Sequence, residues 1–360
     1  MVLHLRGIFL PDETQRDAWI VEGRLSFTPP ARSSDVDTIV SSGWVIPGFV
    51  DAHCHIGIAS TGHVRDPRAQ ARQALLDRDA GALLLREAGS PVDTSSVRQR
   101  DDLPRLIRAG RHIARTRRYI RDQGVEVDPD ALADEVERQA ATGDGWVKIV
   151  GDWIDRASGD LAPTFPEDAL ERAVARAHAL NVRVAVHAFG EDAVAAAIAV
   201  GVDSIEHGTG LTGQMLGDAV SKGIALVPTL INVDNFHKFA AAGEHKFPIY
   251  ARHMRALYAS SRERVRDAYE AGVPIYTGTD AGTDVPHGTI RGEIQALVGA
   301  GLPLPEVIAQ ASWRARQWLG WPGLDEGAPA DLVVFDEDPR VALDTIYSPR
   351  RTVLRGVVVG

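Results

Sequence analysis

Two histidines, separated by one residue, end an apolar stretch of the sequence. His53 and His55 lie in VIPGFVDAHCHIG, which has the pattern of a strand followed by a loop. Side chains alternate along a strand, so both imidazoles are expected on one face and Cys54 on the other. Neutral imidazole is the commonest metal ligand, so the pair predicts a metal site in which Cys54 takes no part. For this pair alone, two ordinary surface or core histidines remain the alternative.

Three more polar residues follow apolar runs in the same way. His187 ends the strand-like run in VRVAVHAFG, His207 ends DSIEHG, and Asp280 lies in YTGTDAG. In a (β/α)₈ barrel the C-terminal ends of the strands meet at one face, where active sites lie. We therefore expect these three residues to join His53 and His55 around metal.

A lysine lies inside another apolar run. Lys148 stands between Val147 and Ile149 in GWVKIVGD. Buried lysines are rare unless they are paired or functional, and burial favours the neutral amine. A neutral amine reacts with CO₂ to give a carbamate, whose two oxygens can bridge two divalent ions. The alternatives are an ion pair with a carboxylate such as Asp152, or a side chain that reaches solvent.

The middle of the chain alternates strand-like and helix-like runs, which predicts an α/β protein built as a (β/α)₈ TIM barrel. The helix-like runs include 167–180 and 191–201. The expected barrel strands are WVIPGFVDAH, GALLLREA, RLIRAGRHI, GWVKIVGD, VRVAVHAFG, DSIEHG, IALVPTL and VPIYTGTD.

Both ends of the chain read as short strands. VLHLRGIFL and AWIVEGRLSF flank PDETQRD at one end, and ADLVVFD and RTVLRGVVVG occur at the other. Chain ends often lie close together, so we expect one small β-sandwich composed of both ends. The expected domains are 1–48 with 323–360 for the sandwich, and 49–322 for the catalytic barrel.

Composition narrows the class of protein. The 360 residues are 44% hydrophobic and carry a net charge of −10, which disfavours nucleic acid or an anionic membrane as a partner. Cys54 is the single cysteine, so no disulfide can form within the chain. The sequence shows no stretch of membrane-spanning length and no signal-peptide pattern. We expect a cytoplasmic protein that acts on a small-molecule substrate, and assembly into a homo-oligomer is left open.

The motifs VIPGFVDAHCHIG, GWVKIV, VRVAVHAFG, VDSIEHGTG and YTGTDAG, in this order, resemble the amidohydrolase superfamily of metal-dependent hydrolases. The ends ADLVVFDEDP and VLRGVVV resemble its composite sandwich. The chain is most similar to the prolidase-like branch with a carboxylated lysine, to which imidazolonepropionase is a more distant relative. The resemblance implies that His53, His55 and Asp280 hold one metal, that His187 and His207 hold the second, and that carboxylated Lys148 bridges them. One departure is Phe189, since relatives often carry a tyrosine shortly after the strand-five histidine.

A pair of divalent ions lowers the pKa of a shared water and polarises a carbonyl. Asp280 is the expected catalytic residue, taking the proton of the attacking hydroxide and delivering it to the leaving nitrogen. Zinc is the expected metal, with manganese or iron as alternatives. The predicted activity is hydrolysis of a C–N bond in an amide, cyclic amide or peptide-like substrate. The alternatives are a prolidase-like dipeptidase or carboxypeptidase, and a lactone or phosphoester hydrolase; a mononuclear deaminase and a non-catalytic scaffold fit the motifs less well.

Other residues are weaker candidates. His287 and His112 are candidate substrate contacts, and Glu87 is a candidate for supporting the metal site. The connection 231–272 either forms a lid over the pocket or packs on the barrel as helices. The basic cluster 115–121 is expected to be solvated, although its three arginines Arg115, Arg117 and Arg118 could bind a substrate carboxylate.

Overall fold

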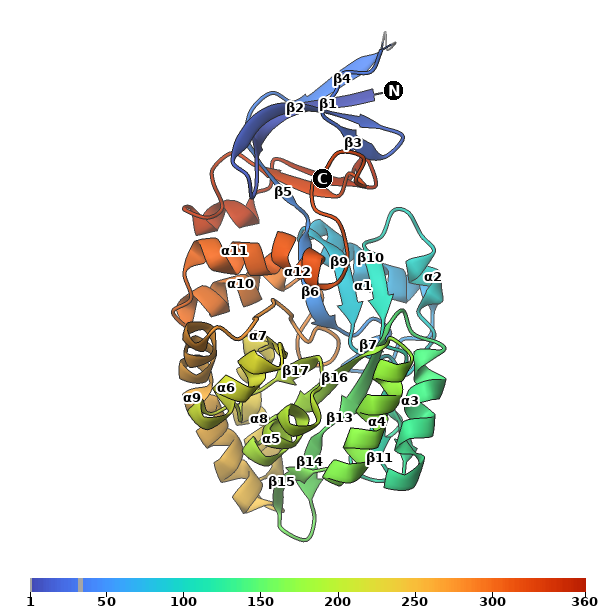
Figure 1. The fold of residues 1–360 in the computed structure, drawn as a ribbon, viewed down its shortest axis with the longest axis vertical. Helices are drawn as coiled ribbons and strands as arrows, with labels where there is room; N and C mark the ends of the chain where they lie inside the picture. The colour runs from blue at the N-terminus through green and yellow to red at the C-terminus, as the bar shows by residue number, and fades with distance from the viewer. Residues whose placement is uncertain (1, 32–34) are drawn as a thin grey trace.

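Parallel strands surrounded by helices form the larger part of the computed structural model, which describes residues 2–31 and 35–360 (Figure 1). One sheet has the order β10-β9-β6 and another has the order β12-β11-β13-β16-β17-β18. Their strands are β6 (Phe49–Cys54), β9 (Ala82–Glu87), β10 (Arg105–Arg108), β11 (His112–Arg115), β12 (Gly124–Val127), β13 (Trp146–Val150), β16 (Arg183–Ala188), β17 (Ser204–His207) and β18 (Ala225–Val227). The predicted run RLIRAGRHI is therefore interrupted, since β10 pairs with β9 and β11 pairs with β13.

The predicted strand VPIYTGTD is irregular in the structure. It makes isolated bridges from Ile275 to Leu226 and from Ala281 to Cys54, and Ala52 N donates to Thr277 O at 2.8 Å. Pro274 cannot donate a backbone hydrogen bond, and a Cβ at Gly278 would lie 2.8 Å from the backbone nitrogen of His53. The segment 274–281 thus runs close against β6 on one side and β18 on the other without forming a regular strand.

Helices cover the outer side of these sheets, which explains why the strands are apolar on both faces. All six residues of β9, for example, are buried. The predicted helices at 167–180 and 191–201 are α4 (Glu167–Ala179) and α5 (Glu191–Val200), and Gly201 ends α5 in the left-handed region at φ 73°. The other helices of this layer are α1 (Pro67–Asp79), α2 (Ser95–Arg98), α3 (Leu132–Ala140), α6 (Gly213–Ser221), α10 (Ile290–Gly299), α11 (Leu304–Ala311) and α12 (Trp313–Trp318).

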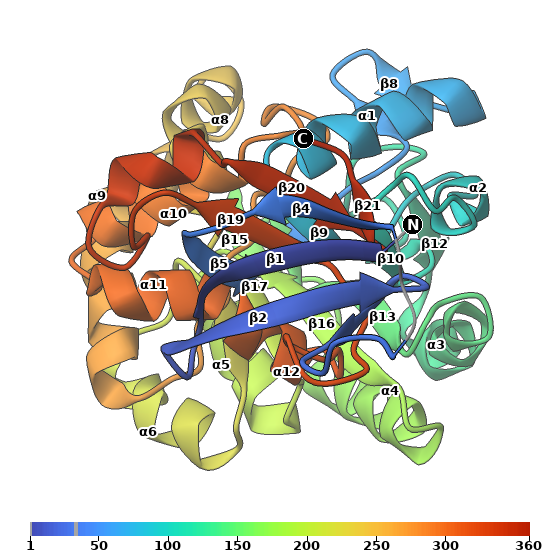
Figure 2. The same ribbon diagram turned by 90° about the horizontal axis from the view of Figure 1, so that it is seen from above.

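Both ends of the chain build one eight-stranded sheet at one end of the molecule (Figures 1 and 2). Its order is β21-β20-β19-β5-β1-β2-β3, with β4 beside β1. The strands are β1 (Val2–Phe9), β2 (Thr14–Val21), β3 (Arg24–Ser26), β4 (Val36–Val40), β5 (Trp44–Pro47), β19 (Leu332–Phe335), β20 (Arg351–Leu354) and β21 (Val357–Val358). The second strand begins inside the expected loop, at Thr14. The composite sheet agrees with the prediction, whereas a sandwich with boundaries at 48 and 323 stays a prediction.

Two elements lie over the opposite end of the barrel strands. The hairpin of β14 (Asp152–Asp155) and β15 (Asp160–Pro163) follows β13 and was not expected from the sequence. The connection after β18 is helical and contains α7 (Leu230–Val233), α8 (Phe236–Gly243) and α9 (Pro248–Ala271). Small elements complete the described chain: β7 (Ile58–Ala59), β8 (Gly62–His63), η1 (Pro129–Ala131) and η2 (Leu343–Tyr347).

Candidate metal centre

Three of the predicted ligands meet at the ends of β6 and the segment 274–281. Asp280 Oδ1 lies 3.1 Å from His53 Nε2 and 2.9 Å from His55 Nε2, and the two Nε2 atoms are 3.2 Å apart. Cys54 points away into the apolar cluster shared with the helices, and its Sγ lies 3.8 Å from the carbonyl oxygen of Arg86. His53 and His55 therefore lie on one face of β6 and Cys54 lies on the other, as the alternation of strand side chains predicted.

His207 joins this group from the end of β17. One ligand atom from each of His53, His207 and Asp280 lies within 4.8 Å of the others. The backbones of His207 and Asp280 lie in the left-handed region, at φ 69° and 59°. Such conformations are uncommon for residues other than glycine and cluster at functional sites. The backbone itself thus marks these two positions as constrained.

His187 lies beside His207, with the ring centroids 4.8 Å apart. Its Nε2 is 3.4 Å from Asp152 Oδ1, and neither atom has a hydrogen-bond partner among the described residues. Burial lowers the pKa of His187 to about 3, so the imidazole is neutral. A neutral imidazole in this position has a lone pair available for a metal.

Lys148 is buried on β13, and its Nζ has no hydrogen-bond partner among the described residues. Burial lowers the pKa of its amine to about 8. The ion pair with Asp152, one of the alternatives, is not formed, since Lys148 Nζ and Asp152 Oδ1 both lack a hydrogen-bond partner among the described residues, and Asp152 Oδ2 accepts instead from the backbone of Phe189 and Gly190 at 2.9 and 2.6 Å. A buried amine without a partner fits a lysine that is modified or bound when the site is filled.

A further shell of polar groups orients the histidines, as is usual for metal ligands. Glu206 Oε2 lies 2.6 Å from His53 Nδ1, and the carbonyl oxygen of Gly89 lies 2.8 Å from His55 Nδ1. Thr229 Oγ1 lies 2.7 Å from His207 Nδ1. With Nδ1 engaged in each case, the Nε2 atoms of His53 and His55 are left to face Asp280.

The carboxylate of Asp280 is the negatively charged member of this group, and each of its two oxygens contacts other side chains. Burial alone would raise its pKa, but His53, His55 and His207 outweigh burial and hold the pKa of Asp280 well below its usual range. Asn232 Nδ2, from α7, donates to Asp280 Oδ2 at 2.7 Å. The carboxylate is therefore ionised, with one oxygen held by an amide and the other facing the histidines.

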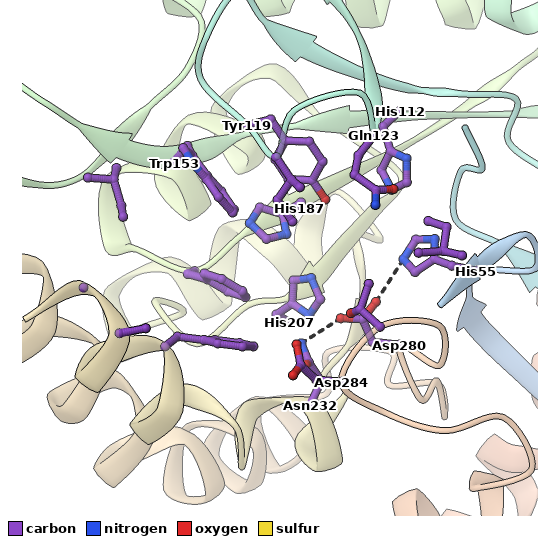
Figure 3. Close-up of a pocket in the computed structure, with 18 of the residues that line it drawn as sticks. His55, His112, Tyr119, Gln123, Trp153, His187, His207, Asn232, Asp280 and Asp284 are labelled. Carbon is purple, nitrogen blue, oxygen red and sulfur yellow. Dashed lines mark hydrogen bonds and ion pairs between the residues drawn. The ribbon is translucent and has the colours of Figure 1, made fainter. Parts of the chain in front are cut away.

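A cavity of about 460 Å³, shown in Figure 3, is lined by all six candidate ligands: His53, His55, Lys148, His187, His207 and Asp280. Its wall includes residues that the sequence did not single out: Tyr119, Gln123, Trp153 and Asn232. Tyr119 lies within the basic cluster that was expected to be solvated, and a tyrosine between arginines gave no signal for a pocket.

The weaker candidates His112, His287 and Glu87 differ in whether they line the cavity. His112 lines the cavity with its ring 5.0 Å from that of His55. His287 does not line it, because its Nδ1 contacts Asp77 Oδ2 at 2.8 Å. Glu87 accepts a hydrogen bond from Thr94 at 2.6 Å and does not line the cavity.

The three arginines of the cluster do not line the cavity either. Arg115 donates to the carbonyl of Thr164, and Arg118 donates to the carbonyls of Trp153 and Ala162. Arg117 contacts Glu126 through its backbone nitrogen. The guanidinium groups of Arg115 and Arg118 thus fix loops around the site.

Comparison with known proteins decides the family. The model of the Amidohydrolase family matches residues 44–360. The chain belongs to this family. An uncharacterized protein of Mycobacterium tuberculosis is 50% identical over 360 residues, covering 99% of this chain and 96% of its own. Ochratoxinase of Aspergillus niger is 27% identical over 237 residues, covering 62% of this chain and 48% of its own.

Solved structures of amidohydrolases share the fold. A crystal structure of a Xaa-Pro dipeptidase with bound methionine in the active site matches with a TM-score of 0.82, 22% identity and full coverage of both chains. That of A. niger ochratoxinase matches with a TM-score of 0.80 and 18% identity, covering 99% of this chain and 95% of that one. These neighbours and the strand arrangement identify a TIM-barrel-like α/β fold. The resemblance inferred from the motifs is confirmed, and the chain is an amidohydrolase-type hydrolase of carbon–nitrogen bonds.

The described part of the chain contains no helix with both the length and the apolar character to cross a membrane.

Proposed function

We propose that this amidohydrolase cleaves an amide, cyclic amide or peptide-like bond with a hydroxide activated at a pair of divalent metal ions. The observation that carries the proposal is the approach of Asp280 Oδ1 to His53 Nε2 and His55 Nε2, at 3.1 and 2.9 Å, at the floor of a cavity. Two imidazole nitrogens and a carboxylate oxygen this close together form a suitable donor set for a divalent cation.

In this proposal His53, His55 and Asp280 would hold one ion, and His187 and His207 the other. Lys148, carrying a carbamate from CO₂, would bridge them. The unpartnered Nζ of Lys148 and the neutral His187 support this assignment. Zinc suits the mixed nitrogen and oxygen donors, with manganese or iron as alternatives.

When bound, the ions would lower the pKa of a shared water and polarise the scissile carbonyl. Asp280 then accepts the proton at its carboxylate and passes it to the leaving nitrogen. Asn232 restricts the rotation of that carboxylate through its hydrogen bond to Oδ2, so Oδ1 stays on the side of the histidines. Glu206 holds the tautomer of His53 in which Nε2 carries the free lone pair.

Two alternatives use the same site. A prolidase-like dipeptidase or carboxypeptidase is suggested by the solved structure named Xaa-Pro dipeptidase. A lactone or phosphoester hydrolase would need the same metals. Further expectations are a closed eight-stranded ring, a small-molecule substrate without nucleic acid or a membrane as partner, and a cytoplasmic location, whereas assembly into a homo-oligomer is left open.

The test combines elemental analysis with hydrolysis of a panel of amides and esters. We expect two metal ions per chain, and loss of hydrolysis on chelation with recovery on adding zinc. Lys148→Ala should lower the content below two ions, whereas the control Lys222→Ala should keep two, because Lys222 does not line the cavity and its Nζ donates to the carbonyls of Ile198 and Ala199. Two tightly held ions in Lys148→Ala would refute the bridge, and a metal-free protein under saturating zinc would refute the proposal.

A further inference from the structure

The cavity above the candidate metal centre has two chemically different sides. One side is a wall of large apolar and aromatic side chains: Trp153 and Ile154 from β14, Phe189 after β16, and Phe239, Phe247 and Tyr250 from the α8–α9 region. In Figure 3, Trp153 stands on the side of the cavity away from His55. An aromatic or branched aliphatic group is the kind of ligand that such a wall stabilises.

This apolar wall is part of a packed cluster. Phe189 lies 4.6 Å from Phe236, centroid to centroid, and Tyr250, Met254 and Leu257 join them. Ile154 and Leu161 of the β14–β15 hairpin pack against the same cluster. The wall is therefore formed before any ligand arrives, and binding an apolar group to it requires little rearrangement.

The other side is more polar and is formed by β11 and the loop between β11 and β12, from which Ile120 also lines the cavity. His112, Tyr119 and Gln123 line it, and the three are neighbours in Figure 3. Tyr119 stands between the two sides, with its ring 5.7 Å from that of His112 and 4.9 Å from that of Trp153. Gln123 Oε1 has no hydrogen-bond partner among the described residues. An amide and a phenol suit a neutral hydrogen-bonding group.

Fixed charge is scarce around this cavity. Outside the six candidate ligands, the charged residues that line it are Lys246 and Asp284, which are both exposed. Lys246 Nζ lies 5.3 Å from the centre of the Phe247 ring, and Arg115 and Arg118 are tied to backbone carbonyls. A charged terminus placed beside Tyr119 and Gln123 would thus be desolvated without a fixed counter-charge.

We propose that the substrate is an uncharged amide with a bulky aromatic or aliphatic group on one side of the scissile bond and a neutral hydrogen-bonding group on the other. The proposal rests on the function proposed above and refines its substrate class. It places the apolar group against Trp153 and Phe247 and the neutral polar group against Tyr119 and Gln123. Small zwitterionic dipeptides, which offer two charges and little apolar surface, are then poor substrates.

Matched substrates test each side separately with the metal-replete enzyme. N-phenylacetylglycinamide against N-acetylglycinamide changes only the apolar group, and N-phenylacetylglycinamide against N-phenylacetylglycine changes only the charge. We expect kcat/KM to be at least tenfold higher for the phenyl compound and for the carboxamide. Equal values within a pair, or a preference for the carboxylate, would overturn the proposal for that side.

Substitution of Trp153 tests whether this residue causes the preference for the phenylacetyl substrate. Trp153→Ala should raise KM for the phenylacetyl substrate by at least tenfold while leaving the acetyl substrate within about twofold. Trp19→Ala is the matched control, because Trp19 is also half-buried but lies on β2 against His4. A variant at Trp153 that slows both substrates equally would indicate a merely structural role and contradict the assignment.

Binding separates this proposal from the proposed function. If the enzyme hydrolyses no member of the panel, including an activated anilide and an ester, the function proposed above fails. Calorimetric titration of the protein with small ligands then still tests which chemical groups the cavity binds. Phenylacetamide should then bind at least tenfold more tightly than both acetamide and phenylacetate, and the preference over acetamide should be lost in Trp153→Ala. Tighter binding of phenylacetate or equal binding of the two amides would refute the proposed ligand class.

Discussion

Asn232 donates from Nδ2 to Asp280 Oδ2 at 2.7 Å, which leaves Oδ1 of Asp280 to face His53 and His55. The position of Asn232 is itself fixed by Glu293, whose carboxylate accepts from the backbone nitrogens of Leu230 and Ile231 at 2.8 and 2.9 Å. A buried residue on α10 thus sets the start of α7, and α7 sets the rotation of the candidate catalytic carboxylate.

Removing this hydrogen bond should slow turnover more than it weakens the fold. We expect Asn232→Ala to lower kcat by about 10- to 100-fold, as is typical when a partner of a metal ligand is lost. Steady-state kinetics and circular dichroism on the metal-replete protein measure the two effects. Asn235→Ala is the control, because Asn235 is three residues further on and its Oδ1 accepts a hydrogen bond from Lys238 Nζ. A kcat for Asn232→Ala within twofold of wild type would exclude the positioning role.

Asp280→Asn keeps the shape of the side chain and removes its capacity to accept a proton. General acid–base groups contribute about 10²- to 10⁴-fold, so we expect at least a hundredfold loss of kcat with the fold retained. The control is Asp336→Asn, an exposed carboxylate paired with Arg350. Near-normal kcat in Asp280→Asn would remove the proton-transfer role.

The pair of Glu206 with Arg86 is fully buried, at 2.8 Å, beside His53. Glu206→Ala would leave the guanidinium of Arg86 buried without its carboxylate, so we expect a loss of about 3–5 kcal/mol in the free energy of unfolding. Urea denaturation measures it. Arg86→Met combined with Glu206→Gln removes both charges and should recover part of the loss. If this double variant is no more stable than Glu206→Ala, the unpaired charge is not the cause.

His253 connects α9 to two other elements, with Nδ1 3.0 Å from Asp160 of β15 and Nε2 2.9 Å from Glu191 of α5. Burial alone would lower the pKa of His253, but its hydrogen bonds to Glu191 and Asp160 and their charges outweigh burial and raise the pKa. The protonated form is therefore favoured in the folded state. Its stabilisation is complete below the unfolded pKa of about 6.5 and is lost as the pH rises through the higher folded value.

The stability difference between wild type and His253→Gln should accordingly shrink as the pH is raised from 5.5 to 9. Denaturation midpoints across this range measure it. Glu191→Gln should weaken the same pH dependence, because it removes one of the two negative partners. A difference that stays constant or grows with pH would contradict the assignment.

The sequence was most informative where strand geometry alone decides direction. Alternation along β6 predicted that His53 and His55 share a face, and apolar runs before His187 and His207 predicted that both would end strands. The irregular course of 274–281 was missed, because Pro274 and the close approach of Gly278 to His53 act through tertiary packing. His287 was expected near the mouth from its place in a loop, but it does not line the cavity, and its Nδ1 contacts Asp77, which is far away in sequence.

Partners that lie on other elements had no local signal. Glu206 precedes His207 on β17, yet its carboxylate reaches His53 on β6. Asn232 follows β18 in a connection for which lid and packed helices were both open. The helices are packed, and the same segment also lines the cavity with Phe239 and Phe247. Contacts between side chains of different elements depend on how these elements pack in three dimensions. The spacing of residues along the sequence does not predict that packing.

The central place of β19 in the terminal sheet has a consequence for how the protein is made. β5 pairs with β1 on one side and with β19 on the other, where Pro47 stands opposite Leu332. Leu332 is synthesised almost 300 residues after Pro47, as the sequence numbers show. During most of translation, the edge of β5 that pairs with β19 therefore has no partner strand. Contacts this distant in sequence form slowly, and an open strand is prone to pair with other chains. Until Leu332 has been synthesised, the edge of β5 that pairs with β19 can therefore pair with another chain.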